Sequence, residues 1–189
     1  MIKFLLFLSL VLLTQSTDLP DLPVVSDFSL PRYMGHWYLY AAIPQIHDFF
    51  CLCPQTTYEI DSKNSSLINF DEYCHVGFVW APILHSKSYG VVYPDNLAKW
   101  TNVNTIIGSW TVSADYYIID LSEEYEFAVV GARNRKSLYV LTRNRTVKDD
   151  VFQGLMEKAR RLGFDVEKVE KSNQSCEESE RMLSKGFMN

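Results

Sequence analysis

Four cysteines are the side chains of this sequence best suited to chemistry: Cys51, Cys53, Cys74 and Cys176. The first three, with the adjoining His75, could supply the thiolate and imidazole ligands that zinc prefers. A single thiol in a cavity could instead act as a nucleophile, provided that it ionises readily. An even number of cysteines in an oxidising compartment favours two disulfides over both of these roles.

Other reactive groups do not form a catalytic pattern. The sequence has no glycine-rich phosphate loop and no serine in a nucleophile elbow. The four histidines lack the helical spacing of a metal site. Glu72 follows Asp71 on an expected strand, so one of the two side chains must face inward; Glu72 is either a polar fixture of a cavity or a solvated side chain. The sequence therefore predicts no catalytic residue, no metal ligand and no cofactor, and hence a protein that is not an enzyme.

The first sixteen residues have the pattern of a secretory signal peptide. Lys3 gives a positive start, Phe4–Leu13 forms a short apolar run, and Thr14-Gln15-Ser16 supplies the cleavage region. The apolar run is too short for a stable membrane anchor, and no cysteine follows it to carry a lipid. We therefore expect a signal peptide over residues 1–16, one domain over 17–176 and a polar tail over 177–189, in a protein secreted from the cell or kept in another compartment of the secretory pathway.

Composition agrees with one globular domain. The chain has 189 residues, 47% of them hydrophobic, and a formal net charge of −5. Lys and Arg are scattered, which argues against a nucleic-acid surface. The one basic cluster, Arg133-Asn134-Arg135-Lys136, lies between two strand-like segments and is expected to be a solvated hairpin tip.

Short segments with alternating apolar residues dominate the chain and predict antiparallel strands. The expected strands are Gly35–Ile43, Leu52–Ile60, Ser66–Cys74, Ser88–Tyr93, Ala98–Val103, Tyr116–Leu121, Glu126–Gly131, Ser137–Thr142 and a last short one, Phe164–Val169. The segment Val76–His85 looks irregular, and Thr105–Val112 looks like a loop or a broken strand. The periodicity alone fits a sandwich as well as a barrel.

One amphipathic helix is expected after the strands. Thr146 and Asp149 have the spacing of a capping box, and Gly163 is a natural stop. Between them, apolar residues recur at helical spacing from Val151 to Leu162, which predicts a face that packs on the strands.

Three separated segments resemble the motifs of the lipocalin family, most closely its apolipoprotein D and bacterial lipocalin branch. Leu30–Pro44, with Gly35-x-Trp37, resembles the first motif; Asp115–Gly131 resembles the second; Leu138–Arg143 resembles the third, in which the arginine lies across the tryptophan. One departure is visible: the Thr-Asp-Tyr usual in the second motif is not kept, and Ser122 stands near the position of its aspartate. This difference loosens a contact that the resemblance implies at the closed end of the barrel. The resemblance implies an all-β fold, an eight-stranded antiparallel up-and-down β-barrel with a C-terminal α-helix packed outside.

The resemblance also implies a cavity for a small hydrophobic ligand. Alternation puts Leu141 and Tyr139 on the same face as Arg143, and Ile68 and Glu72 on the same face as Phe70. The resemblance turns Tyr58 inward as well. The register of the four candidates on the middle strands, Tyr89, Val91, Trp100 and Tyr117, is open. Phe49 and Phe50 lie in the loop that covers the open end in this family. The candidate ligand-lining residues are Tyr58, Ile68, Phe70, Glu72, Tyr89, Val91, Trp100, Tyr117, Tyr139, Leu141, Phe49 and Phe50. Each could equally be core filling.

Two disulfide pairings stay open. Cys51 and Cys53 share a strand and are poor partners for each other, whereas the hairpin around residues 61–66 brings Cys74 opposite both. The family often ties the tail to the barrel, which gives Cys176 the remaining partner. Family position favours Cys51 with Cys74, and hairpin register favours Cys53 with Cys74.

Asn64, Asn144 and Asn173 each begin a glycosylation sequon. With the resemblance, the sequence predicts a secreted protein that binds and transports a fatty acid, sterol, retinoid or tetrapyrrole. Two alternatives remain: a lipocalin-type enzyme with a cavity thiol, and a protein-binding lipocalin that acts through its open-end loops. A weak oligomer is compatible with the sequence, and no receptor is implied.

Overall fold

The computed structural model describes residues 19–45, 51–77, 83–107 and 110–176, with only the backbone course given for residues 103–112. The expected signal peptide, the loop phenylalanines Phe49 and Phe50, and the expected tail over 177–189 lie outside the described residues.

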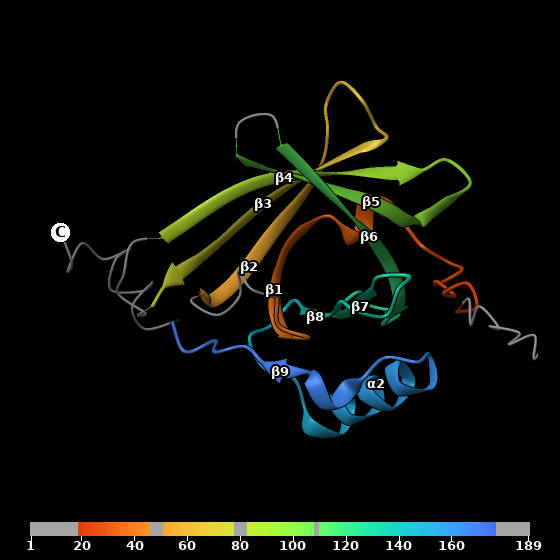
Figure 1. The fold of residues 1–189 in the computed structure, drawn as a ribbon, viewed down its shortest axis with the longest axis vertical. Coiled ribbons are helices and arrows are strands. Elements are labelled where there is room, and N and C mark those ends of the chain that lie inside the picture. The colour runs from red at the N-terminus through yellow and green to blue at the C-terminus, as the bar shows by residue number, and fades with distance from the viewer. Residues whose placement is uncertain (1–18, 46–50, 78–82, 108–109, 177–189) are drawn as a thin grey trace, which may run out of the picture.

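The strands of the described residues form a closed antiparallel β-barrel (Figure 1). Each strand pairs with the next in sequence, and β1 pairs with both β2 and β8, which closes the barrel. The strands are β1 (Gly35–Ala42), β2 (Cys51–Ile60), β3 (Leu67–Val76), β4 (Ile83–Tyr93), β5 (Asn96–Ile107), β6 (Trp110–Leu121), β7 (Phe127–Gly131), β8 (Leu138–Thr142) and β9 (Glu170–Lys171). The eight-stranded barrel that the resemblance implied is confirmed, with β9 added along the edge of β1.

Several strands are longer than alternation predicted. β3 and β4 continue into the segment that looked irregular. β5 extends to Ile107, and β6 already begins at Trp110. The expected strand over 164–169 is wrong, because those residues include a 3-10 turn, η2 (Val166–Lys168), before β9. Phe164 and Val166 are nevertheless buried, so their apolar signal reflected packing and not strand pairing.

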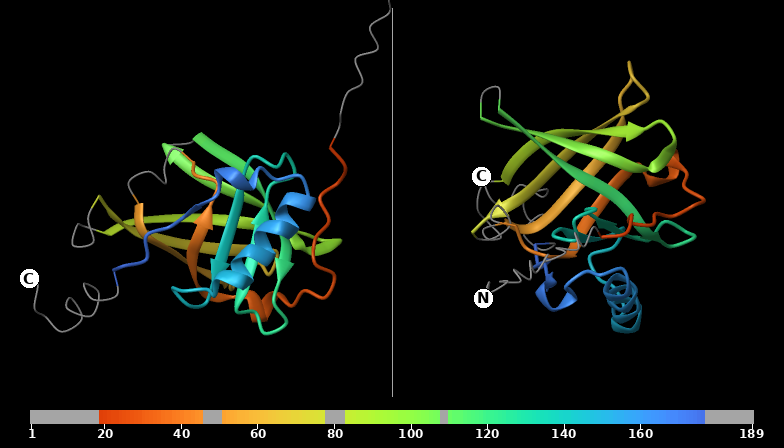
Figure 2. Two further views of the ribbon diagram at one scale, coloured as in Figure 1. Left: turned by 90° about the horizontal axis from the view of Figure 1, so that it is seen from below. Right: turned by 45° about the vertical axis from the view of Figure 1, so that its right-hand side comes forward.

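A single long helix of the described residues, α2 (Asp149–Arg161), lies outside the barrel against β7, β8 and β1 (Figure 2). Phe152, Leu155, Met156 and Ala159 form its buried face, as the apolar spacing predicted. The predicted capping box is wrong: the residue before the helix is Lys148, and no side chain caps it. Asp149 and Asp150 in the first turn instead favour this end electrostatically, because they face the positive pole of the helix dipole.

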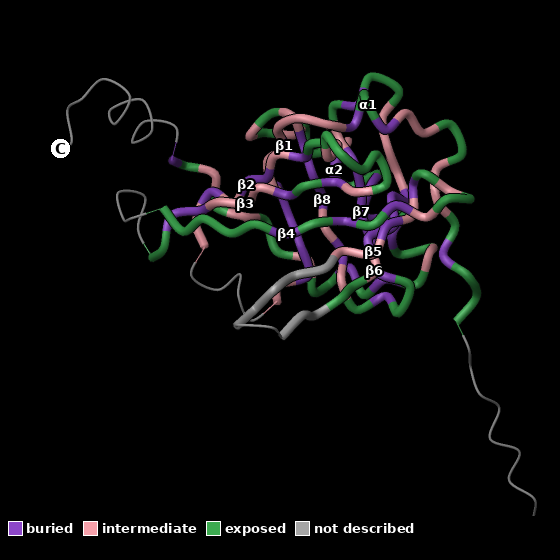
Figure 3. Tube along the Cα trace, turned by 90° about the horizontal axis from the view of Figure 1, so that it is seen from above, coloured by how far each residue is buried: buried purple, intermediate pink, exposed green. Residues whose placement is uncertain are grey.

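Two apolar clusters divide the protein into layers. The outer cluster joins α2 to the barrel wall and includes Tyr40, Val129, Leu138 and Val140. The inner cluster draws residues from all of β1 to β8 and also from α1 (Leu30–Tyr33), which closes one end of the barrel. Figure 3 shows the buried segments gathered in the middle of the barrel, with the residue-83 end of β4 exposed.

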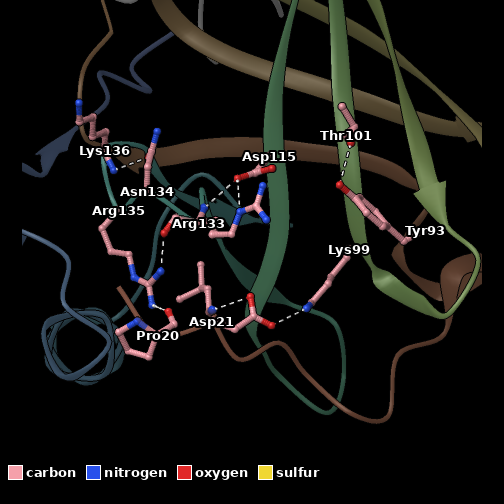
Figure 4. Close-up of polar contacts among 11 residues, drawn as sticks. Pro20, Asp21, Tyr93, Lys99, Thr101, Asp115, Arg133, Asn134, Arg135 and Lys136 are labelled. Carbon is pink, nitrogen blue, oxygen red and sulfur yellow. Dashed lines mark hydrogen bonds and ion pairs between the residues drawn. The ribbon is translucent and has the colours of Figure 1, made fainter. Parts of the chain in front are cut away.

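The N-terminal arm is fixed to the outside of the barrel by buried and charged contacts (Figure 4). Leu22 is fully buried in the outer cluster. The ammonium of Lys99 lies 3.0 Å from Asp21 Oδ2, and this contact lowers the pKa of the Asp21 carboxyl. The expectation of a solvated basic tip is wrong for Arg135, which is only 8% exposed and donates to the carbonyls of Pro20 and Leu162. Part of the basic cluster therefore ties the arm to the end of α2.

Candidate ligand-binding site

The closed end of the barrel is built around Trp37. Gly35 has φ +91°, a conformation open to glycine, and lets the chain turn from α1 into β1. Trp37 is then fully buried, and its indole nitrogen donates to the carbonyl of Tyr33 over 2.8 Å. The indole therefore forms the base of the barrel interior, as the resemblance implied.

Arg143 seals this base from below. Its guanidinium carbon lies 3.8 Å from the centre of the Trp37 ring. Its nitrogens donate to the carbonyls of His36 (2.6 Å), Met34 (2.8 Å) and Arg32 (3.0 Å). Those carbonyls include groups at the end of α1 that no helical amide can reach. One side chain thus covers the tryptophan and satisfies the backbone of the closed end.

Aromatic rings fill the interior directly above this base. Trp100 and Tyr116 stack with centroids 4.9 Å apart, and Phe70 lies edge-on to Tyr58 at 4.7 Å. Such tilted and offset pairs add to the stability given by burial alone. We call these residues, with Tyr33 and Trp37, the aromatic floor. It fills the interior directly above the base.

Three buried hydroxyls form a chain through the floor. The hydroxyl oxygens of Tyr33 and Tyr116 lie 2.8 Å apart, and the Tyr116 hydroxyl donates to the Tyr58 hydroxyl over 2.9 Å. Burial raises the pKa of all three phenols well above the usual value, since a phenolate would lose its hydration. The floor is therefore a neutral surface at any physiological pH.

Most of the predicted ligand-lining residues that the structure describes do face the interior. Tyr58, Ile68, Phe70, Trp100 and Leu141 belong to the inner cluster, and Tyr139 packs against it. Glu72 follows Ile68 and Phe70 on the inward face of β3. Its carboxylate accepts a hydrogen bond from Ser86 Oγ on β4 over 3.3 Å.

Three predicted positions are wrong. Tyr89 and Val91 are 39% and 38% exposed on the outer face of β4, because Ser88, Gly90 and Val92 hold the inward positions. Tyr117 belongs to the outer cluster.

Tyr116, the neighbour of Tyr117, is the inward residue, and the sequence analysis did not identify it. Tyr33 was missed as well, because it lies in α1 and not on a strand. In the structure Tyr116 is the register partner of the inward Trp100, a relationship that alternation within one strand does not reveal.

Both pairs of cysteines are joined. Cys51 bonds to Cys74, and Cys53 bonds to Cys176, which resolves the open alternative in favour of the pairing that family position suggested. All four cysteines are used, so none remains to bind zinc as a thiolate.

The second disulfide holds the C-terminal segment in a gap between two strands. β1 and β2 pair only as far as Tyr38 and Gln55. Beyond that point the side chain of Gln174 donates to the carbonyls of Leu39 (2.9 Å) and Pro54 (3.1 Å). We call residues 170–176 the C-terminal segment and the gap it fills the seam.

A pocket of about 170 Å³ opens at this seam. Inward-facing Leu39 and Ala42 line it with the rim residues Pro44, Cys51 and Pro54, and residues 170–173 cover it. Leu39 also packs against the inner cluster, so the pocket lies next to the barrel interior, at the end of β1 away from Gly35.

The three sequon asparagines are exposed at separate places. Asn64 lies in the turn between β2 and β3, Asn144 follows β8, and Asn173 lies in the C-terminal segment. Each of the three side chains is therefore accessible to solvent. No helix of the described residues is long and apolar enough to cross a membrane.

The barrel, its sealed base and its inward aromatic residues define a calyx-type binding protein. The sequence model of the lipocalin-like domain family matches residues 28–174. The chain therefore belongs to the lipocalin family.

Individual relatives agree with this assignment. Temperature-induced lipocalin-1 of Arabidopsis thaliana is 25% identical over 167 residues, covering 84% of this chain and 86% of that protein. The outer membrane lipoprotein Blc of Escherichia coli (strain K12) is 30% identical over 147 residues, covering 77% and 78%.

Solved structures share the fold. Lobster apocrustacyanin A1 superposes with a TM-score of 0.62 at 12% identity, over 78% of this chain and 80% of that one. Insecticyanin from the tobacco hornworm Manduca sexta gives 0.60 at 15% identity, over 82% and 85%.

Proposed function

We propose that this protein binds and carries a small hydrophobic molecule in the upper half of its barrel. The observation that carries the proposal is the inner cluster, in which all of β1 to β8 contribute apolar or aromatic side chains above a sealed base. Membership of the lipocalin family supports the same role. A fatty acid, sterol, retinoid or tetrapyrrole would each gain roughly 25 cal/mol per Å² of apolar area buried, before ordering costs.

The open side of this site lies toward the outer ends of β3 and β4. The inward position Ser88 is only 8% exposed, whereas the next inward positions, Ser86 and Leu84, are exposed. Solvent therefore reaches the inner face of this hairpin above the aromatic floor. This is the part of the interior that a ligand would enter and cover.

A cavity-thiol enzyme is the weaker alternative. Its nucleophile would have to be Cys51 or Cys53, and both sulfurs are bonded to other cysteines. The disulfides also support a location outside the reducing cytosol. We therefore propose a non-enzymatic protein of the secretory pathway or cell exterior, with Asn64, Asn144 and Asn173 as accessible glycan sites.

Two neighbouring substitutions on β4 test where the ligand lies. Ser86→Trp would fill the inward face, and Lys87→Trp would add the same ring to the outward face; both positions are exposed, so neither change disturbs a packed core. We expect saturable binding of the neutral fluorophore N-phenyl-1-naphthylamine by the wild type. The Ser86 variant should lose at least about tenfold in affinity, ~1.4 kcal/mol, and the Lys87 variant should bind as the wild type does. Equal affinities in all three proteins would place the binding elsewhere.

A further inference from the structure

The sequon at Asn173 lies within the C-terminal segment, where the chain is tied to the barrel on both sides of the acceptor. The carbonyl of Asn173 accepts a hydrogen bond from the amide of Cys53 over 2.7 Å, and the amide of Ser172 donates to the carbonyl of Tyr40 over 2.8 Å. Three residues after Asn173, Cys176 is fully buried and bonded to Cys53. The acceptor side chain is therefore exposed, but its backbone is fixed in the seam.

The middle residue of the sequon, Gln174, joins the segment to both neighbouring strands. Its Nε2 donates to the carbonyls of Leu39 on β1 (2.9 Å) and Pro54 on β2 (3.1 Å). The residues on either side of it close the sequon on itself, because Asn173 Oδ1 accepts from both the amide (2.9 Å) and the hydroxyl (2.6 Å) of Ser175. All three residues of the sequon are thus engaged in the folded protein.

Attachment of an N-glycan requires the sequon to leave these contacts. The asparagine nitrogen attacks the first sugar carbon of a lipid-linked oligosaccharide; the new N–C bond replaces the C–O bond to the pyrophosphate, which departs with the electron pair while the nitrogen loses a proton. The transferase must hold both the asparagine and the hydroxyl two residues later. In the closed segment that hydroxyl is bonded to Asn173, and Gln174 between them is bonded to two strands. The segment therefore has to open before it can enter an active site.

The sequon at Asn64 is placed differently. Asn64, Ser65 and Ser66 are all exposed in the turn between β2 and β3. This turn follows Ile60, at the opposite end of β2 from Cys53. Opening or closing the seam should therefore leave the exposure of this sequon unchanged, which makes it an internal reference for Asn173.

We propose that Asn173 is a glycan acceptor only before Cys53 and Cys176 are joined, and that formation of this disulfide ends its modification. The modified fraction is then set by which acts first, the transferase or oxidation of the two thiols. A glycan attached earlier remains on an exposed side chain and does not prevent closure of the seam. The inference rests on the proposed location in the secretory pathway and assigns one of its glycan sites to a stage of folding.

Glycan occupancy of the full chain tests the proposal, measured by mass spectrometry of glycopeptides after secretion from cultured eukaryotic cells. Replacing Cys53 and Cys176 together by serine should raise the ratio of modified to unmodified chains at Asn173 by at least about threefold, because the bond no longer opposes opening of the segment. The ratio at Asn64 should not change.

The matched variant, with Cys51 and Cys74 replaced by serine, removes the other disulfide and keeps Cys53–Cys176. It should leave the ratio at Asn173 at the wild-type value, which separates closure of the seam from a general loss of stability. Two treatments of cells that make the wild type need no variant. Dithiothreitol, which keeps the cysteines reduced, should raise the ratio at Asn173, and diamide, which hastens disulfide formation, should lower it.

The outcomes separate this inference from the proposed function. Equal ratios at Asn173 in the wild type and in both variants, an equal rise in both variants, or no glycan at Asn173 in any protein whose Asn64 is modified would overturn the inference and leave the proposed function standing. A chain that stays in the cytosol without a glycan at any sequon would overturn the proposed location together with the inference.

Discussion

The ring of Phe70 lies in the space that a side chain at position 90 would occupy. A Cβ atom placed on Gly90 would come within 2.9 Å of Phe70 Cζ and 3.5 Å of Trp100 Cε3. Both rings belong to the aromatic floor, so neither can move away cheaply. The aromatic floor can therefore close across the barrel at β4 because Gly90 has no side chain.

Gly90→Ala should accordingly destabilise the protein by about 1–3 kcal/mol through overpacking. Gly154→Ala is the control: it lies on the exposed face of α2 with nothing within 4 Å of the added carbon. That change should stabilise by up to about 1 kcal/mol, because alanine favours a helix over glycine. Urea unfolding of both variants measures the difference, and a neutral Gly90 variant would show that the floor is looser than its contacts indicate.

The contact between Arg143 and Trp37 leads to a second prediction. Trp37→Ala removes a buried ring and should cost about 3–5 kcal/mol. Arg143→Ala should cost at least about 2 kcal/mol, since it leaves the carbonyls of Met34 and His36 without their donor. Arg143→Lys should recover only part of this loss, because an ammonium cannot reproduce the planar fork. The exposed Arg161→Ala, which breaks a surface ion pair with Glu157, should change stability by less than about 1 kcal/mol.

This closed end was the part of the site that sequence could predict. Gly35, Trp37 and Arg143 carry a family motif, and alternation on β3 and β8 then places Phe70 and Leu141 correctly inside. Their positions follow from local pattern because each strand is anchored at one recognised residue.

The middle strands lacked such an anchor. On β4 the register is open from sequence alone, and the candidates for the inward face are Tyr89 and Val91, not Gly90. The structure reverses this, because the inward space is already taken by Phe70, a contact between residues twenty positions apart that no local pattern records. Tyr117 was misplaced for the related reason that α2 covers the outer face of its strand and makes that face apolar too.

The tyrosine chain predicts how stability depends on pH. Burial raises the pKa of Tyr33, Tyr58 and Tyr116 in the folded state, whereas in the unfolded chain they ionise near pH 10. The folded state therefore holds these protons longer, so its stability is complete below about pH 10 and falls as the pH rises above it. Each buried phenol contributes a slope of up to about 1.4 kcal/mol per pH unit.

Tyr116→Phe should flatten this decline and, below pH 10, cost about 1–3 kcal/mol, since the hydroxyls of Tyr33 and Tyr58 lose their common partner. Unfolding by urea between pH 8 and about pH 11 measures both effects. The exposed Tyr89→Phe serves as the control and should leave the slope unchanged. A wild-type stability independent of pH across this range would contradict the buried, neutral hydroxyl chain.

The C-terminal segment gives the last prediction. Cys53–Cys176 closes a loop of sequence separation 123 and Cys51–Cys74 one of 23, so chain entropy alone assigns them about 5 and about 3 kcal/mol. Their local effects should differ more, because only the first holds residues 170–176 in the seam. There the amide of Cys53 donates to the carbonyl of Asn173 over 2.7 Å, and that of Ser172 donates to the carbonyl of Tyr40 over 2.8 Å.

Replacing Cys53 and Cys176 together by serine should therefore speed hydrogen exchange at residues 53 and 172 by at least about tenfold, since local opening would no longer be opposed by the bond. Exchange at the paired half of β1, over residues 35–38, should stay slow. The matched variant, with Cys51 and Cys74 replaced by serine, should leave residue 172 protected. Equal protection of residue 172 in both variants would mean that β9 and Gln174 hold the segment without the disulfide, in which case adding Gln174→Ala to the first variant should release it.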